Sequence, residues 1–262
     1  MSAPTISPFS SPLLPDELIH ILNDSAPCGN LSVAAIDAEI YLNGEEMRIA
    51  SQWLSETEHS QLNRFSFVKR RSEWLSGRIC AKQAVLDYLG ERGGQSGLDP
   101  RKIRIEANPS GRPFLNISGL PAPAREVDIS ISHSHGKAVA IAGNGLCGVD
   151  IQYLSETLFK VKDRYCTDIE TALLDVTSIE ELAQLGLLWV AKEAVRKSLS
   201  GIALTGFLEI HLEGLRIEQG YHILNFRLEK PFSSLGTVSV TTNLHKSFAL
   251  AVSTIARERV NA

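Results

Sequence analysis

The chain has 262 residues, of which 44% are hydrophobic and 21% are charged, and its formal net charge is −4. These values are typical of a globular protein with a substantial core, and the negative charge disfavours a general nucleic-acid binder. No window holds the roughly 18 apolar residues of a membrane span. The four cysteines have no CxxC spacing, so neither structural zinc nor a disulfide framework is expected. We therefore expect a cytoplasmic protein with no membrane partner and no nucleic-acid partner.

The N-terminal third is predicted to open irregularly and then to become helical. Residues 1–30 are rich in Ser and Pro and lack the basic and apolar regions of a signal peptide, so they predict an irregular arm. Residues 31–42 suggest a strand, and residues 44–62 look helical. Residues 72–90 place apolar side chains at three- and four-residue steps, which predicts a long amphipathic helix ending at Gly90.

The rest of the chain alternates strands with one further long helix. Alternating patterns predict strands around a tight turn at Gly136, and the helical period returns before the final antiparallel strands. The expected strands are 102–106, 127–132, 137–142 and 149–152, the helix is 179–200, and three or four strands follow over 207–254.

Two segments recur at an offset of 110 residues, which indicates an internal duplication. The sequence AKQAV at 81–85 matches AKEAV at 191–195, and KAVAIA at 137–142 resembles SFALAV at 247–252. Chance similarity of small apolar residues is the alternative for either match alone. Two matches at one offset favour two similar α+β halves.

We therefore expect a pseudo-twofold α+β protein with three parts. The irregular arm covers 1–30, the N-terminal α+β half covers 31–143, and the C-terminal α+β half covers 144–262. The second half carries the predicted metal site described next.

The helix around WVAKEAVRK at 189–197 places one carboxylate among several cations. Glu193 and Lys197 are four residues apart and share a face, and Lys192 can reach a phosphate from the same helix. A carboxylate for a hard metal beside lysines for phosphate suggests phosphate chemistry. A solvated surface ion pair is the common alternative for such a spacing.

Asp150 and Gln152 alternate on a predicted strand and so face the same side. Asp150 can supply a carboxylate oxygen to Mg²⁺, while an Asp that merely begins a strand is the alternative. His133 and His135 have the same spacing. Zinc is disfavoured there because no third ligand sits at a recognisable spacing, and a structural histidine is the simpler interpretation.

Four motifs in order resemble the surfactin-type 4′-phosphopantetheinyl transferases. They are GRPFL at 111–115, SISHSHG at 130–136, GVDIQ at 148–152 and WVAKEAVRK at 189–197. The resemblance implies a pseudo-twofold fold with its active site between the halves, and we expect a monomer. It also implies transfer of phosphopantetheine from coenzyme A to a serine of an apo acyl or peptidyl carrier protein, with Mg²⁺ and release of 3′,5′-ADP.

The resemblance also implies roles for individual residues. Asp150 and Glu193 would bind the metal, Glu193 would activate the serine, and Lys197 would lie near the pyrophosphate. Gln152 stands where a second acid is usual, so its contact with the metal stays open. The expected coenzyme A contacts are Arg112, Ser132, His133 and Lys192, together with basic residues among Lys69, Arg70, Arg71 and Arg78.

Two other functions remain open from the sequence. One is a metal-dependent hydrolase of the coenzyme A pyrophosphate, and the other is a non-catalytic protein that binds a carrier or coenzyme A. The Asp150, Glu193 and Lys197 set disfavours a non-catalytic protein. Neither the carrier nor its pathway is predicted.

Overall fold

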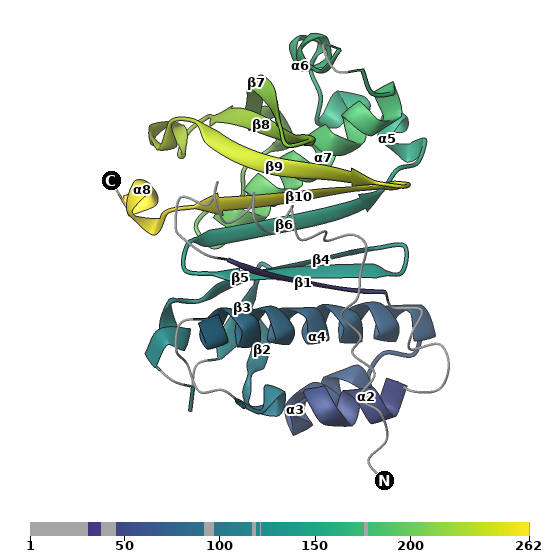
Figure 1. Cartoon of the computed structure of the whole chain (residues 1–262), viewed down its shortest axis with the longest axis vertical. Coiled ribbons are helices and arrows are strands. Elements are labelled where there is room, and N and C mark those ends of the chain that lie inside the picture. The colour runs from purple at the N-terminus through teal and green to yellow at the C-terminus, as the bar shows by residue number, and fades with distance from the viewer. Residues whose placement is uncertain are drawn as a thin grey trace.

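The computed structural model describes residues 31–37, 46–91, 97–116, 119–120, 122–175 and 178–261. The predicted arm over 1–30 and the end of the predicted strand beyond Asp37 lie outside these residues. Figure 1 shows two layered units, one above the other, each with a sheet and a long helix. The protein is therefore α+β, as the sequence predicts.

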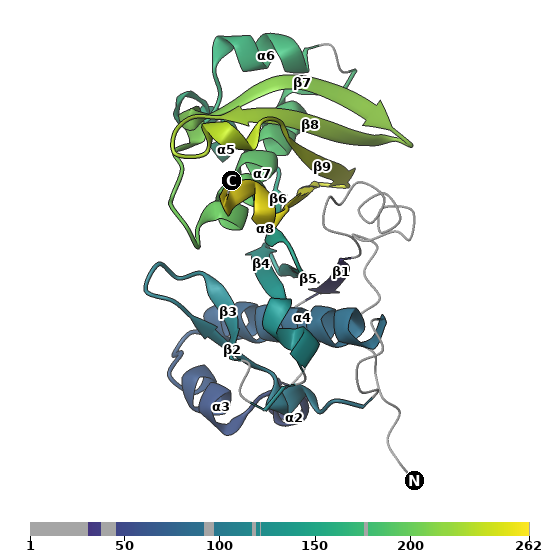
Figure 2. The ribbon, with the colours of Figure 1, turned by 90° about the vertical axis from the view of Figure 1, so that its left-hand side faces the viewer.

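The first unit packs a long helix, α4, on a three-stranded antiparallel sheet of order β1-β5-β4. Two shorter helices and a two-stranded hairpin surround α4 (Figures 1 and 2). In chain order the elements are β1 (Ser32–Asp37), α2 (Glu46–Trp53), α3 (Glu56–Leu62), α4 (Val68–Glu91), β2 (Arg104–Ala107), β3 (Pro113–Asn116), β4 (Asp128–Ser134) and β5 (Lys137–Gly143).

The second unit packs helix α7 on a five-stranded antiparallel sheet of order β6-β10-β9-β8-β7. Its elements are β6 (Leu146–Tyr153), α5 (Thr157–Lys160), α6 (Asp168–Leu174), α7 (Glu181–Leu199), β7 (Ile210–Glu218), β8 (Tyr221–Leu228), β9 (Val238–His245), β10 (Phe248–Ile255) and α8 (Arg257–Asn261). The predicted boundary between residues 143 and 144 falls in the connection from β5 to β6.

The structure differs from the predicted elements at two places in the N-terminal unit. The helix predicted over 44–62 is broken because Ser55 caps a new helix, α3, with Glu58 completing a reciprocal capping box. Helix α4 begins at Val68, four residues before the predicted start. The predicted turn between β4 and β5 places His135 at φ 46° and Gly136 at φ 76°, which is the geometry of a tight hairpin.

The two units repeat the same order of elements. Helix α3 corresponds to α6, α4 to α7, β4 to β9 and β5 to β10. Helix α4 packs mainly on β5, the central strand of its sheet, while α7 packs mainly on the edge strand β6 and its neighbour β10. The matched segments 81–85 and 191–195 lie at equivalent places on the two long helices, as a duplication requires.

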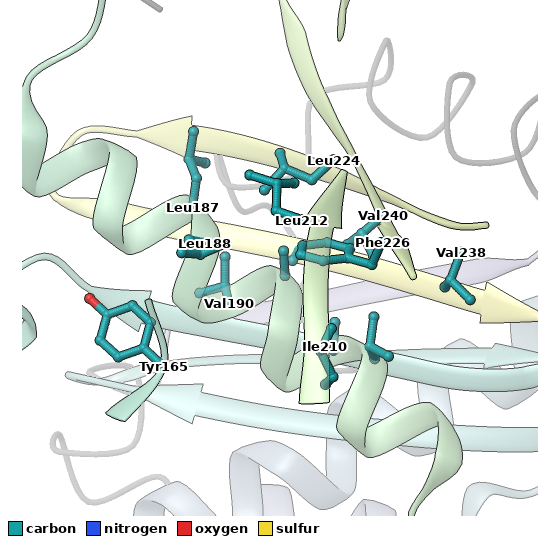
Figure 3. Close-up of a cluster of buried hydrophobic side chains, with 14 of the residues drawn as sticks. Tyr165, Leu187, Leu188, Val190, Ile210, Leu212, Leu224, Phe226, Val238 and Val240 are labelled. Carbon is teal, nitrogen blue, oxygen red and sulfur yellow. The ribbon is translucent and has the colours of Figure 1, made fainter. Parts of the chain in front are cut away.

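Within the described ranges, three hydrophobic clusters form the core. One fills the first unit around α4, and a second fills the other unit around α7, where Figure 3 shows Leu188, Val190 and Phe226 packed together. The third cluster joins the outer faces of the two sheets, with Ile141 on β5 meeting Val149 and Ile151 on β6. Because this third cluster is apolar and buried, the two units are packed as one body.

Close contact between β6 and α7 fixes the strand that carries Asp150. A Cβ atom added at Gly148 would lie 1.8 Å from the Ala194 carbonyl oxygen on α7. Only glycine allows this approach.

Among the described residues, no helix combines the length and apolar character needed to cross a bilayer.

Candidate active site

Asp150 lies on β6 and is held at one of its two carboxylate oxygens. Oδ1 accepts a hydrogen bond from Ser132 Oγ at 2.7 Å and one from Lys197 Nζ at 2.8 Å. The Asp150 side chain is only 9% exposed, while that of Lys197 is 29% exposed. Lys197 Nζ also donates to the Val149 carbonyl at 2.9 Å, so the ammonium bridges α7 and β6.

Glu193 lies one helical turn before Lys197 on α7 and is paired with Arg196 at 3.0 Å. Burial raises the pKa of Glu193, and the charge of Asp150 raises it further, against the opposing effects of Arg196 and Lys197. The carboxylate of Asp150 on β6 and the carboxylate of Glu193 on α7 therefore repel each other. The sequence prediction that Asp150, Glu193 and Lys197 act together is consistent with this placement.

The donor set at this place fits a hard divalent cation. Two carboxylates that repel each other gain by sharing a cation, and Mg²⁺ commonly takes one or two carboxylates together with water and substrate phosphate. Within the described residues, no cluster of three or more His, Cys, Asp or Glu side chains forms a self-sufficient metal cage. The set suits an ion whose remaining ligands come from substrate.

Gln152 follows Asp150 on β6 but turns part of its amide to the backbone. Its Nε2 donates to the Tyr153 carbonyl at 2.9 Å, and its side chain is half-buried. This bond orients the amide plane. Contact of Gln152 with a metal stays a prediction.

Lys192 does not occupy the position that the sequence predicts for a phosphate ligand. Its side chain is 0% exposed, and its Nζ lies 2.7 Å from Glu170 Oε1. Its Nζ also donates to the carbonyls of Tyr165 at 2.7 Å and Phe207 at 3.2 Å. All three ammonium protons are thus used inside the second unit, and we correct the predicted phosphate contact of Lys192 to a structural one.

Arg112 also turns inward, although we predicted a contact with the nucleotide end of coenzyme A. Its side chain is 9% exposed and pairs with Asp128 at 2.5 Å. The guanidinium also donates to Ser200 Oγ at 3.0 Å and to the Lys197 carbonyl, both at the end of α7. Arg112 therefore connects the β2–β3 hairpin to the C-terminus of α7 and does not present a free cation.

A cavity of about 180 Å³ opens between α4, the β2–β3 hairpin and β4. It is lined by Arg70, Glu73, Trp74, Gly77, Arg78, Ala107, Gly111, Pro113, Ile131 and His133. Arg78 stacks over Trp74 at 4.9 Å, which orients its guanidinium in the cavity wall. Two arginines and one histidine, against the single carboxylate of Glu73, suit this cavity to an anion, and the charge of Asp150 acts on the His133 in its wall.

The remaining predicted basic contacts separate by position. Arg71 is directed away from the cavity, since its guanidinium pairs with Glu46 at 3.0 Å. Lys69 is 82% exposed and lies 4.0 Å from Glu73. Of the predicted set, Arg70 and Arg78 alone line the cavity as the structure describes it. We therefore correct the prediction for Arg71.

Ser132 and His133 are neighbours that point to different places. The Ser132 hydroxyl is buried against Asp150, so it is not free for the predicted contact with coenzyme A. His133 is exposed and lines the cavity, where desolvation lowers its pKa while Glu73 partly opposes that effect. His135, for which no role was predicted, stacks on Tyr153 at a centroid distance of 4.4 Å.

Comparison with known proteins identifies the chain. Residues 43–146 match the family model described as "4'-phosphopantetheinyl transferase, N-terminal". The holo-[acyl-carrier-protein] synthase of Clostridium kluyveri is 31% identical over 116 residues, which are 41% of this chain and 76% of that protein. The chain belongs to the 4′-phosphopantetheinyl transferase superfamily.

Other members resemble this transferase over similar lengths. The holo-[acyl-carrier-protein] synthase of Bacillus subtilis is 32% identical over 97 residues, covering 37% of this chain and 77% of the relative. The crystal structure of holo-ACP-synthase from Plasmodium yoelii superposes with a TM-score of 0.36 and 18% identity, covering 43% of this chain and 90% of that one. The surfactin-type subgroup stays a prediction.

Sequence reasoning missed Glu58, Ser130 and Ser134, which support the site from behind, and found in Glu170 only a weak match to an acidic position of the family. Glu58 and Glu170 each anchor a buried lysine, and Ser130 and Ser134 flank Ser132 on β4. A signal existed for the first pair, because each acid lies three residues after a Ser or Thr in a capping box.

Proposed function

We propose that this protein transfers the 4′-phosphopantetheine group of coenzyme A to a serine of an apo acyl or peptidyl carrier protein. The proposal rests on two groups of side chains that act on each other. Asp150 pairs with Lys197, and its charge acts on Glu193. The charges of Asp150 and Lys197 also act on His133, which lines the cavity together with Arg70 and Arg78. The cations suit the phosphates of the nucleotide end, and the carboxylates suit the reacting end. Membership of the superfamily supports the same activity.

In the proposed reaction, the oxygen of the carrier serine attacks the β-phosphorus of coenzyme A. The bond from that phosphorus to the bridging oxygen breaks, and 3′,5′-ADP leaves. Glu193 accepts the serine proton, as a carboxylate placed beside the reacting group can. Lys197 donates to Asp150 and to the carbonyls of Val149 and Ile131, but its side chain is 29% exposed, so its charge can offset negative charge that develops on the phosphate oxygens.

We propose that Asp150 and Glu193 hold Mg²⁺, with Gln152, two residues after Asp150 on β6, as a candidate further oxygen donor. When bound, the ion would neutralise pyrophosphate charge and orient it. Arg70, Arg78 and His133 would fix the nucleotide, so that the protein acts chiefly by positioning and charge neutralisation.

Glu193→Gln tests the proposal directly, because the amide keeps the size of the side chain and removes its charge. We expect loading of an apo carrier to fall by about 10²–10⁴-fold, the usual contribution of a general base. Intact-mass spectrometry of the carrier measures loading, and the thermal midpoint of the variant serves as a control for folding. Loading at the wild-type rate would show that Glu193 has another role.

A reaction without carrier separates transfer from hydrolysis. The proposed transferase should leave coenzyme A intact when only Mg²⁺ is added, while a pyrophosphate hydrolase would consume it. A panel of apo carriers from fatty-acid, polyketide and peptide synthases would then identify the partner through the mass that each carrier gains.

We further propose a monomer acting in the cytoplasm. The monomer is supported by the apolar cluster and the Arg112 contacts, which join both units within one chain. The cytoplasmic location is supported by the buried thiols of Cys80, Cys147 and Cys166, which form no disulfide in the part of the chain that the structure describes. Light scattering of the purified chain measures the oligomeric state.

A further inference from the structure

The two sheets meet at strands β4 and β6, which run side by side without joining into one backbone ladder. Strand β6 is an edge strand whose backbone pairs with β10, while β4 is an edge strand that pairs with β5. An edge strand presents alternate N–H groups that need acceptors when they are buried. On β6, side chains of β4 supply those acceptors.

The acceptors follow each other at every second residue of β4. Asp128 Oδ2 accepts from the Cys147 N–H at 2.7 Å, and Ser130 Oγ accepts from the Val149 N–H at 3.0 Å. The next two bonds are Ile151 N–H to Ser132 Oγ at 3.3 Å and Tyr153 N–H to Ser134 Oγ at 3.0 Å. We call this set, Asp128, Ser130, Ser132 and Ser134 with their four amides, the side-chain ladder.

A constant offset of 19 residues joins each acceptor to its donor, so the side-chain ladder fixes a single register between the two units. A slip by two residues would move every hydroxyl to another amide. The register determines which β4 side chain stands beside Asp150, because Asp150 lies between two of the bonded amides on β6.

Ser132 is the member of the side-chain ladder beside Asp150, and its hydroxyl makes two hydrogen bonds. The oxygen accepts from the Ile151 N–H, and the proton is donated to Asp150 Oδ1 at 2.7 Å. Lys197 donates to that same oxygen at 2.8 Å. Among the described residues, Asp150 Oδ2 accepts no hydrogen bond. One oxygen of the carboxylate is thus fully engaged, and the other is left for a ligand.

We propose that Ser132 is a positioning residue that orients Asp150 so that Oδ2 is presented to the divalent cation. The side-chain ladder holds the Ser132 oxygen in place through the Ile151 N–H, so the hydroxyl proton is directed at Asp150 Oδ1. The N-terminal unit thereby sets the orientation of a carboxylate that belongs to the C-terminal unit. This inference rests on the proposed function, since it takes Asp150 as a metal ligand.

Ser130→Ala is the matched control for Ser132→Ala, because both variants lose one bond of the side-chain ladder. Ser132 alone also touches a carboxylate. We expect both variants to lower the thermal midpoint by similar amounts. Mn²⁺ affinity in the presence of coenzyme A, followed by the loss of free Mn²⁺ signal in electron paramagnetic resonance, should fall about 10–100-fold in Ser132→Ala. It should stay near wild type in Ser130→Ala.

Ser132→Thr and Ser132→Val form a second comparison that does not depend on the alanine variant folding. The two side chains have the same shape, and only threonine keeps the hydroxyl. Threonine should retain most of the Mn²⁺ affinity, and valine should lose it to the extent that alanine does. Equal affinity in these two variants, or an equal loss in Ser130→Ala and Ser132→Ala, would overturn the inference.

Carrier loading by the wild-type protein is measured beside Mn²⁺ affinity, which separates the two proposals. Absence of loading with the Ser132 contrast intact would reject the transferase function and leave the positioning role standing. Carrier loading together with equal Mn²⁺ affinities in Ser130→Ala and Ser132→Ala would support the transferase function and reject the positioning role. A wild-type protein that binds no Mn²⁺ would overturn the positioning role.

Discussion

Lys192 Nζ lies 2.7 Å from Glu170 Oε1, and both side chains are withdrawn from solvent. The first unit contains the same arrangement, with Lys82 Nζ 2.6 Å from Glu58. In each unit the lysine lies on the long helix and the acid lies on the short helix before it. In each, the acid also accepts from a strand amide, Ile105 or Leu212. The repeated pair fastens three elements of each unit together.

Lys192→Met tests whether this lysine is structural. Removing one partner leaves Glu170 charged and buried, so the free energy of unfolding should fall by about 3–5 kcal/mol. Urea unfolding measures the loss, and Lys82→Met should lose a similar amount. Coenzyme A affinity, measured by calorimetry where the variant is folded, should stay close to wild type. A large loss of affinity with normal stability would restore the predicted phosphate contact.

The same pair predicts a dependence of stability on alkaline pH. Desolvation lowers the pKa of Lys192 from 10.5, although Glu170 raises it in part. Between the lowered pKa and 10.5 the unfolded chain binds more protons, so this group's contribution to stability rises with pH. Lys192→Met lacks the contribution. Its destabilisation relative to wild type should therefore be larger at about pH 10 than at about pH 7.5. A difference that shrinks with pH would contradict the direction of the shift.

Arg112→Leu should lower the free energy of unfolding more than it lowers the affinity for coenzyme A. The change leaves Asp128 without its guanidinium partner and the end of α7 without its connection to the hairpin. We expect a loss of about 3–5 kcal/mol in unfolding free energy, as for other broken buried pairs. Arg70→Leu is the contrast, because Arg70 is exposed in the cavity wall. It should weaken coenzyme A affinity with little change in thermal midpoint.

Gly148→Ala tests the contact between β6 and α7 that positions Asp150. The added methyl group would meet the Ala194 carbonyl at 1.8 Å and Ser198 Oγ at 2.5 Å. Backbone must move to admit it, so the cost should reach or exceed the roughly 1–3 kcal/mol of ordinary overpacking. Gly214→Ala is the control, since nothing lies within 4 Å of a Cβ atom there. Equal thermal midpoints in the two variants would show that α7 can withdraw from β6 without cost.

The motifs predicted Asp150 and Lys197 for one site, and the structure brings the two side chains into contact. Their roles in a reaction stay predictions. The sequence could not predict the fates of Lys192 and Arg112. Helical spacing places Lys192 near Glu193 along the chain, but the side chain enters the core because Glu170, twenty-two residues earlier, offers a buried partner. Such pairing depends on tertiary contacts between α6 and α7, which periodicity does not encode.

The serines of β4 show the same limit in another form. Alternation in SISHS predicts a strand with one polar face, and the strand is present. A polar face usually indicates exposure to solvent, yet Ser130 and Ser132 are buried because the amides of β6 need them. The partner strand comes from the other unit. Only the packing of the two units distinguishes this buried polar face from a solvent-exposed one.

Gln152→Glu tests how far the metal site extends along β6. A second carboxylate beside Asp150 should tighten Mg²⁺ binding, so activity should saturate at lower Mg²⁺ concentration, by roughly tenfold if the introduced carboxylate enters the coordination sphere. Gln152→Ala is the control. It removes the bond from the amide to the Tyr153 carbonyl without adding charge. Carrier loading titrated with Mg²⁺ measures both variants. An unchanged Mg²⁺ dependence in Gln152→Glu would place this residue outside the coordination sphere and leave Asp150 and Glu193 as the two proposed ligands.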